Sequence, residues 1–153
     1  MFSVNDWLHI GKYRDTLDLG YLQAVGIGAM LQLAELVKQP GIETLYLPVE
    51  DGEPLPLNLL VKGLIFMEGQ LEQKNPILIA CGAGVSRSVA FAMAALREFE
   101  GLSLVDAFHT IQDIHPQALP HPALLASLCR YYMDEPSREV FMTIHHIEKF
   151  PFS

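Results

Sequence analysis

The chain has 153 residues, of which half are hydrophobic, and it carries a formal net charge of −8. This length suffices for a single domain over residues 1–153, and the high apolar content excludes a disordered chain. The negative charge argues against a general surface for nucleic acids or anionic membranes. The sequence shows no membrane span or export signal, so we expect a cytoplasmic protein that binds neither nucleic acid nor membrane.

The first half of the chain alternates between expected strands and helices. Short apolar segments predict strands at 7–11, within 27–33 and within 42–49. Apolar residues at helical spacing predict helices at 15–25 and 57–71. An acidic segment with two prolines, 50–56, separates the third strand from the second helix and is expected to be a loop.

The second half begins with an apolar run after Pro76 that ends at Cys81, which predicts another strand. Helices are expected at 88–99, from 103 to 114, through 124–131 and, as an extra C-terminal helix, at 137–149. Strands that alternate with helices predict an α/β domain. We expect a central, mostly parallel sheet of about four or five strands flanked by helices.

The stretch between the fourth strand and its following helix combines three chemical features. Five residues separate the Cys81 thiol from the Arg87 guanidinium, and the loop between them contains two glycines. Backbone N–H groups at the start of a helix bind anions. The phosphate-binding residues of this loop are expected to be Gly82, Ala83, Gly84, Val85, Ser86 and Arg87.

This combination predicts nucleophilic attack on a phosphate ester. Only the thiolate of cysteine is the nucleophile, and a nearby cation and a helix N-terminus both stabilise it. The planar guanidinium of Arg87 matches two oxygens of a tetrahedral anion. We therefore expect a phosphocysteine intermediate on Cys81. A buried structural thiol at a strand end is the plain alternative, but it does not explain the arginine and the glycines.

The motif from Cys81 to Ser88 resembles the C-x5-R-[ST] signature of cysteine-dependent dual-specificity protein phosphatases, and most closely their small atypical members. The opening Trp-Leu-His-Ile-Gly segment and the His-Pro and Pro-His-Pro segments of 115–122 extend this resemblance over roughly 5–132. The resemblance implies a phosphatase-like fold and hydrolysis of phosphate monoesters without a metal or cofactor. The substrate would be phosphotyrosine, phosphoserine or phosphothreonine on a protein, or a small phosphorylated metabolite.

The same resemblance assigns two further catalytic residues. In the family an aspartate about 30 residues before the cysteine protonates the leaving oxygen, and Asp51 occupies that place. Glu50 and Glu53 are neighbours in the same loop that could act instead. The hydroxyl that follows the arginine in the family corresponds to Ser88, which would hydrogen-bond the thiolate.

One position departs from the family pattern. The family usually has histidine directly before the cysteine, where it braces the loop, and this chain has Ala80. A phosphate-binding pseudophosphatase with little turnover is therefore an alternative function. A sulfurtransferase or an arsenate reductase is a third, because these enzymes also use short loops from cysteine to arginine.

The remaining candidate residues have plainer interpretations. Cys129, the other cysteine, is expected in the core, and two cysteines at no recognised spacing favour reduced thiols. His145 and His146 are adjacent in an expected helix and would point apart, so no metal site is expected. The loop between Cys81 and Arg87 is uncharged, which favours a monoester over a polyanionic substrate.

Overall fold

The computed structural model describes residues 1–133 and 143–145. A five-stranded sheet lies at its centre, in the order β1-β2-β5-β3-β4. The strands are β1 (Phe2–Ser3), β2 (Leu8–Lys12), β3 (Ala29–Gln32), β4 (Glu43–Tyr46) and β5 (Ile77–Cys81). Four strands are parallel, and β1 pairs antiparallel with β2 at one edge. The predicted α/β class and mostly parallel sheet are therefore confirmed.

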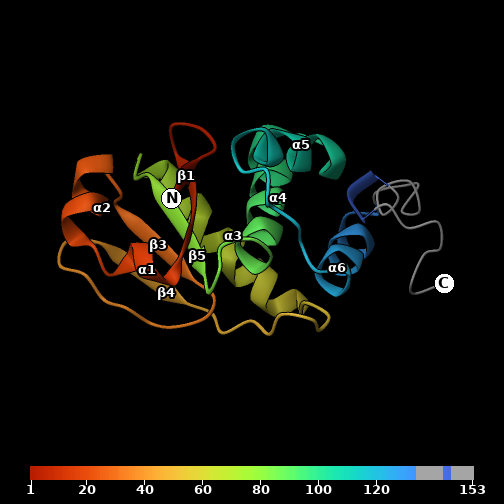
Figure 1. The fold of residues 1–153 in the computed structure, drawn as a ribbon, viewed down its shortest axis with the longest axis horizontal. Coiled ribbons are helices and arrows are strands. Elements are labelled where there is room, and N and C mark those ends of the chain that lie inside the picture. The colour runs from red at the N-terminus through yellow and green to blue at the C-terminus, as the bar shows by residue number, and fades with distance from the viewer. Residues whose placement is uncertain (134–142, 146–153) are drawn as a thin grey trace.

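Within residues 1–133, six helices pack around the sheet and on one another. They are α1 (Tyr13–Thr16), α2 (Leu19–Val25), α3 (Leu57–Glu72), α4 (Arg87–Glu100), α5 (Leu104–Ile114) and α6 (Pro122–Tyr132). Figure 1 shows α1 and α2 at one end of the view and α4, α5 and α6 grouped at the other. No helix in the described part of the chain is long and apolar enough to cross a membrane.

The central strand and the helix that follows it form the interior of the domain. All five residues of β5 are buried, because β2 and β3 flank this strand and helices cover both faces of the sheet. Helix α4 packs against β5 and β2, and α3, α5 and α6 pack around it. Nine successive residues of α4, from Ser88 to Leu96, are buried, as its nearly continuous apolar sequence predicted.

Three details differ from the sequence-based expectations. The expected helix at 15–25 is divided, because the side chain of Asp18 accepts the N–H of Tyr21 and starts α2 as a separate helix. The short strand β1 was not expected. Of the expected C-terminal helix at 137–149, only residues 143–145 are described, and they are helical.

Candidate active site

The loop from Cys81 to Arg87 lies at the carboxyl end of β5, where α4 begins. Cys81 is 3 % exposed, and its thiol donates a hydrogen bond of 3.2 Å to Oγ of Ser88. The backbone N–H of Ser88 lies 3.4 Å from the same sulfur and donates to it. The first turn of α4 therefore supplies both hydrogen-bond partners of the buried thiol, as expected for Ser88.

Hydrogen bonds from outside the loop fix three of its carbonyl groups, those of Gly82, Gly84 and Val85. The N–H of Tyr13 donates 3.3 Å to the carbonyl of Gly82, and Nε2 of His115 lies 2.9 Å from the carbonyl of Gly84. The N–H of Leu119 donates 2.8 Å to the carbonyl of Val85. In a planar trans peptide the C=O and the following N–H point in opposite directions. The N–H groups of Ala83, Val85 and Ser86 therefore point away from these three donors.

Two glycines allow the loop to fit against its neighbours. Gly84 has a positive φ of 74°, and a Cβ there would lie 2.9 Å from the carbonyl oxygen of Gly11. A Cβ on Gly82 would lie 3.2 Å from Nη2 of Arg87. The guanidinium thus lies beside the first residue of the loop, and a side chain at position 84 would clash with backbone.

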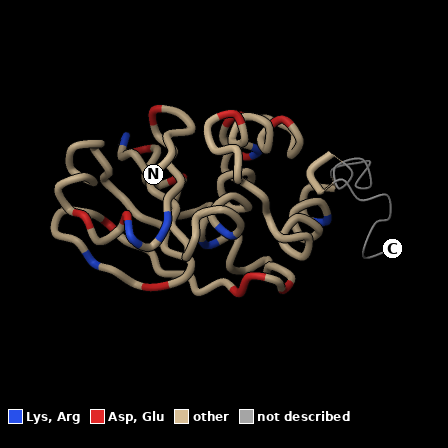
Figure 2. Tube along the Cα trace, in the orientation of Figure 1, with Lys and Arg blue, Asp and Glu red and all other residues tan. Residues whose placement is uncertain are grey.

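The guanidinium of Arg87 also contacts the chain that follows β4. Its Nη1 donates a hydrogen bond of 3.0 Å to the carbonyl of Val49. Figure 2 shows the acidic segment of the loop after β4 along the lower edge of the molecule, below the start of α4. Arg87 therefore joins the cysteine loop to the loop that carries the candidate acids.

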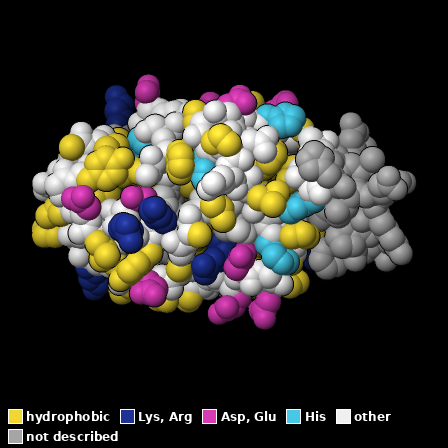
Figure 3. All heavy atoms as spheres, viewed as in Figure 1, with side chains coloured by type: hydrophobic (Ala, Val, Ile, Leu, Met, Phe, Trp, Pro, Cys, Tyr) yellow, Lys and Arg dark blue, Asp and Glu magenta, His cyan; other side chains and the backbone are white. Residues whose placement is uncertain are grey.

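Ser86 makes the second connection between these loops. Its Oγ donates a hydrogen bond of 2.7 Å to Oδ1 of Asp51 and accepts one of 2.9 Å from the N–H of His121. Glu50 and Glu53 are both exposed and make no hydrogen bond or salt bridge to the described residues. Of the three candidate acids, Asp51 is the one that contacts the cysteine loop. Figure 3 shows acidic and basic side chains side by side on this face.

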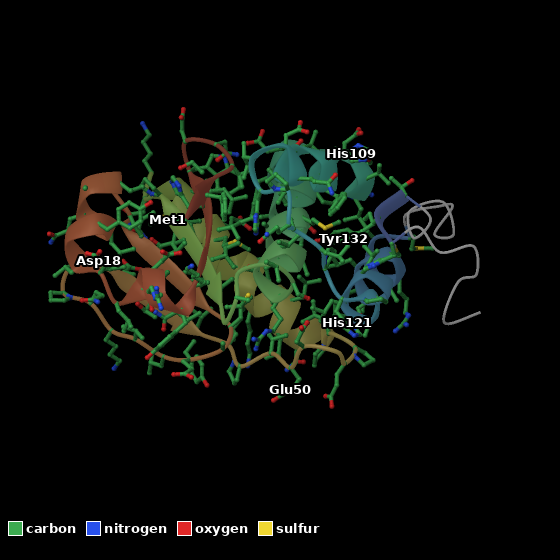
Figure 4. The ribbon with its side chains drawn as sticks, viewed as in Figure 1. Met1, Asp18, Glu50, His109, His121 and Tyr132 are labelled. Carbon is green, nitrogen blue, oxygen red and sulfur yellow. The ribbon has the colours of Figure 1, made fainter. Side chains whose placement is uncertain are left out.

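Helix α6 supports the far end of the acidic loop. The N–H of Leu55 donates 2.9 Å to Oγ of Ser127, and the hydroxyl of Tyr131 donates to the carbonyl of Leu55. Figure 4 shows His121, which precedes α6, close to the loop that carries Glu50. These contacts were not predicted from the sequence. The available signal in the sequence was Ser127, a polar residue within the apolar pattern of α6.

Ala80 lies outside this network, on the opposite face of β5. It is 3 % exposed, within a small apolar cluster formed by Leu22, Ile27, Met30 and Leu78. Beside the loop itself, His115 contacts the carbonyl of Gly84. In the part of the chain described here, no group of three or more His, Cys, Asp or Glu residues could hold a metal ion.

This arrangement of a buried thiol, a loop with two glycines at the start of a helix and a carboxyl group hydrogen-bonded to that loop agrees with the comparison with known families. The family model for the dual specificity phosphatase catalytic domain matches residues 8–134. The chain belongs to this family of cysteine-dependent phosphatases. The resemblance stated from the sequence is thereby confirmed.

Individual relatives give the same result. The chain is 29 % identical over 130 residues to human dual specificity protein phosphatase 16, covering 81 % of this chain and 19 % of that protein. It is 26 % identical to the putative tyrosine phosphatase 123R of Invertebrate iridescent virus 6, and the match covers 69 % of this chain and 75 % of that protein. The crystal structure of human DUSP28 superposes with a TM-score of 0.81 at 26 % identity, covering 87 % of this chain and 96 % of that one. The chain thus spans about a fifth of the first relative's length.

Proposed function

We propose that this chain hydrolyses phosphate monoesters through a phosphocysteine intermediate. The contact between Ser86 and Asp51 carries the proposal, because it brings a carboxyl group to the loop that holds Cys81 and Arg87. A cysteine or an arginine with only a structural role would not require a carboxyl group at this loop. Family membership favours a phosphatase over a sulfurtransferase or an arsenate reductase.

In the first step, the Cys81 thiolate attacks phosphorus. An S–P bond forms while the P–O bond to the leaving group breaks, and Asp51 donates a proton to the leaving oxygen. Arg87 and the N–H groups of Ala83, Val85 and Ser86 bind the other phosphoryl oxygens and stabilise their charge. Oδ2 of Asp51 is the oxygen suited to carry the proton, because Oδ1 accepts the Ser86 hydroxyl.

In the second step, water attacks the phosphorus of the phosphocysteine. The Asp51 carboxylate accepts a proton from this water, the S–P bond breaks, and inorganic phosphate leaves. The departing sulfur recovers its electron pair, and the hydroxyl of Ser88 at 3.2 Å stabilises the thiolate as it forms. Neither step requires a metal or another cofactor.

The proposed substrate is a phosphomonoester on Tyr, Ser or Thr of a protein, or a small phosphorylated metabolite. The side chains between Cys81 and Arg87 carry no positive charge. They therefore offer no ion pair to the additional phosphate groups of a polyanionic substrate. A reduced Cys81 thiol is needed for the reaction, which suits the cytoplasm as the proposed location.

The test is the hydrolysis of p-nitrophenyl phosphate in the presence of a chelator. We expect turnover by the wild-type chain and none by Cys81→Ser, since a hydroxyl is a far weaker nucleophile here. Cys129→Ala is the matched control, because Cys129 is buried in α6 and is not part of the loop. Full activity in Cys81→Ser, or loss of activity on chelation, would contradict the proposal.

A phosphate-binding module with little turnover is the second candidate, and the alanine at position 80 favours it. Calorimetry with a phosphopeptide, run beside the activity assay, separates the two functions. Binding without turnover by the wild-type chain supports the second candidate, whereas turnover that depends on Cys81 supports the first.

A further inference from the structure

The peptide unit between Gly84 and Val85 is held by a side chain. The carbonyls of Gly82 and Val85 accept hydrogen bonds from main-chain N–H groups, which every non-proline residue can supply. The carbonyl of Gly84 instead accepts a hydrogen bond of 2.9 Å from Nε2 of His115. A carbonyl can only accept, so this contact places a proton on Nε2 of the imidazole.

His115 is itself firmly positioned. It follows the last residue of α5, its own N–H donates 2.9 Å to the carbonyl of Ile111, and it is 3 % exposed. Its ring stacks on the ring of Phe2, with 3.9 Å between the centroids and 12° between the planes. Phe2 lies in β1, opposite Ile10 of β2. The imidazole is thus fixed between the end of α5 and the edge of the sheet.

Close packing restrains this part of the loop on one side, where Gly84 lies against the backbone of Gly11. A cavity of about 170 Å³ lies beside it, lined in part by Phe2, Gly84, Val85 and His115. In the described part of the chain, the carbonyl of Gly84 accepts no second hydrogen bond. The hydrogen bond from His115 is therefore the main local restraint on the Gly84 carbonyl.

From this geometry we propose that His115 is a positioning residue for the phosphate site. By holding the Gly84 carbonyl outward, it directs the N–H of Val85 toward the bound phosphate, because the two groups share one planar peptide. His115 thereby supports the loop from the end of α5, whereas the position before the cysteine holds Ala80. The inference rests on the proposed function, because that function places the phosphate at this loop.

The test measures phosphate affinity without turnover. Iodoacetate alkylates the Cys81 thiolate, bound inorganic phosphate protects it, and peptide mass spectrometry distinguishes Cys81 from Cys129. His115→Phe keeps an aromatic ring against Phe2 but removes the donor, and His115→Gln restores an N–H donor at a similar reach. The matched control is His109→Ala, because His109 is exposed on α5 and lies far from the acidic loop in Figure 4.

We expect His115→Phe to weaken phosphate binding roughly tenfold, as for the loss of one hydrogen bond to a charged group. His115→Gln should remain within about threefold of wild type, and His109→Ala should match it. In the activity assay, His115→Phe should raise KM more than it lowers kcat. Wild-type phosphate affinity in His115→Phe, or equal losses in the Phe and Gln variants, would overturn the inference.

If His115→Phe does not fold, His115→Asn replaces it, since its amide is one methylene too short to reach the carbonyl. The same tenfold loss in His115→Asn supports the inference, and unchanged affinity overturns it. A wild-type chain that binds phosphate but does not hydrolyse esters contradicts the proposed function alone. The protection assay then still decides the role of His115.

Discussion

The hydroxyl of Ser86 donates a hydrogen bond of 2.7 Å to Asp51, a residue 35 positions earlier in the chain. Ser86 was expected from the sequence only to bind phosphate. The same oxygen accepts the N–H of His121, so the direction of its own proton toward Asp51 is fixed. Ser86 therefore contacts the candidate acid as well as forming part of the loop from Cys81 to Arg87.

Ser86→Ala should lower kcat for substrates with poor leaving groups about tenfold, because Asp51 loses the contact that orients it. The measurement is kcat for a series of aryl phosphates of different leaving-group pKa. Ser103→Ala is the matched control. Ser103 caps α5, so its removal should cost about 1 kcal/mol of stability while kcat stays unchanged.

A double variant tests whether Ser86 acts through Asp51. If it does, Ser86→Ala should have little further effect on kcat in an Asp51→Asn background, because the two residues then act as one unit. Fully additive losses would show that Ser86 acts independently of Asp51.

Asp51→Asn should lower kcat by about 100-fold for alkyl phosphates and much less for p-nitrophenyl phosphate. A good leaving group departs as an anion and needs little protonation, whereas an alkoxide needs a proton. Steady-state kinetics with both substrates checks this. Glu53→Gln, an exposed neighbour in the same loop, should behave as wild type. An unchanged rate in Asp51→Asn with a large loss in Glu50→Gln or Glu53→Gln would transfer the acid role.

Ala80→His should destabilise the chain and fail to increase turnover. Position 80 lies among apolar residues such as Met30 and Leu78, so a larger polar side chain there is overpacked and lacks a partner. We expect a loss of about 1–3 kcal/mol in the free energy of unfolding, measured in urea. Ala83→His, at an exposed loop position, should leave this free energy nearly unchanged. A stable Ala80→His variant with higher kcat would contradict this prediction.

The stability of the fold should fall as the pH decreases through the titration of His9. Burial lowers the pKa of His9 from its usual 6.5, and its Nδ1 lies 2.9 Å from Oγ of Ser3. Below about pH 6.5 the unfolded chain therefore binds a proton that the folded chain does not bind until lower pH. The contribution of His9 to stability is complete above that pH and is lost below it.

Urea unfolding at about pH 7.5 and about pH 5.5 measures this effect. His9→Gln should show a smaller difference between the two free energies of unfolding than wild type. His109→Gln, which replaces an exposed histidine, should retain the wild-type difference. Identical differences in wild type and His9→Gln would rule out His9 as a source of the pH dependence.

Local sequence patterns sufficed for the centre of the fold. The apolar run before Cys81, the glycines after it and the apolar helix from Ser88 predicted β5, the loop and α4 in order. The strand β1 could not be predicted in this way, because two residues carry no periodicity and form a strand only by pairing with β2. The division of the helix at Asp18 was not predicted, because the apolar spacing continues across this residue and does not indicate that its side chain caps α2.

The site was predictable where side chains carry the chemistry. Cys81, Arg87, Ser88 and Asp51 lie together in the structure, although their catalytic roles remain predictions. The main-chain donors of Tyr13 and Leu119 leave no signal in the sequence, since any residue offers an N–H group. His115 was noted only as part of a His-Pro segment that extends the family resemblance, because its contact with Gly84 depends on how α5 packs.

The close fit of Gly84 against Gly11 restricts how this loop can be altered. At position 84 a side chain would meet backbone, and at position 11 it would lie 2.8 Å from the Asp15 carboxylate and 2.9 Å from Leu78. Neither site can therefore serve to redesign substrate preference. Ala83, which is exposed between Gly82 and Gly84, is where a library of substitutions can change what the enzyme accepts while the loop keeps its shape.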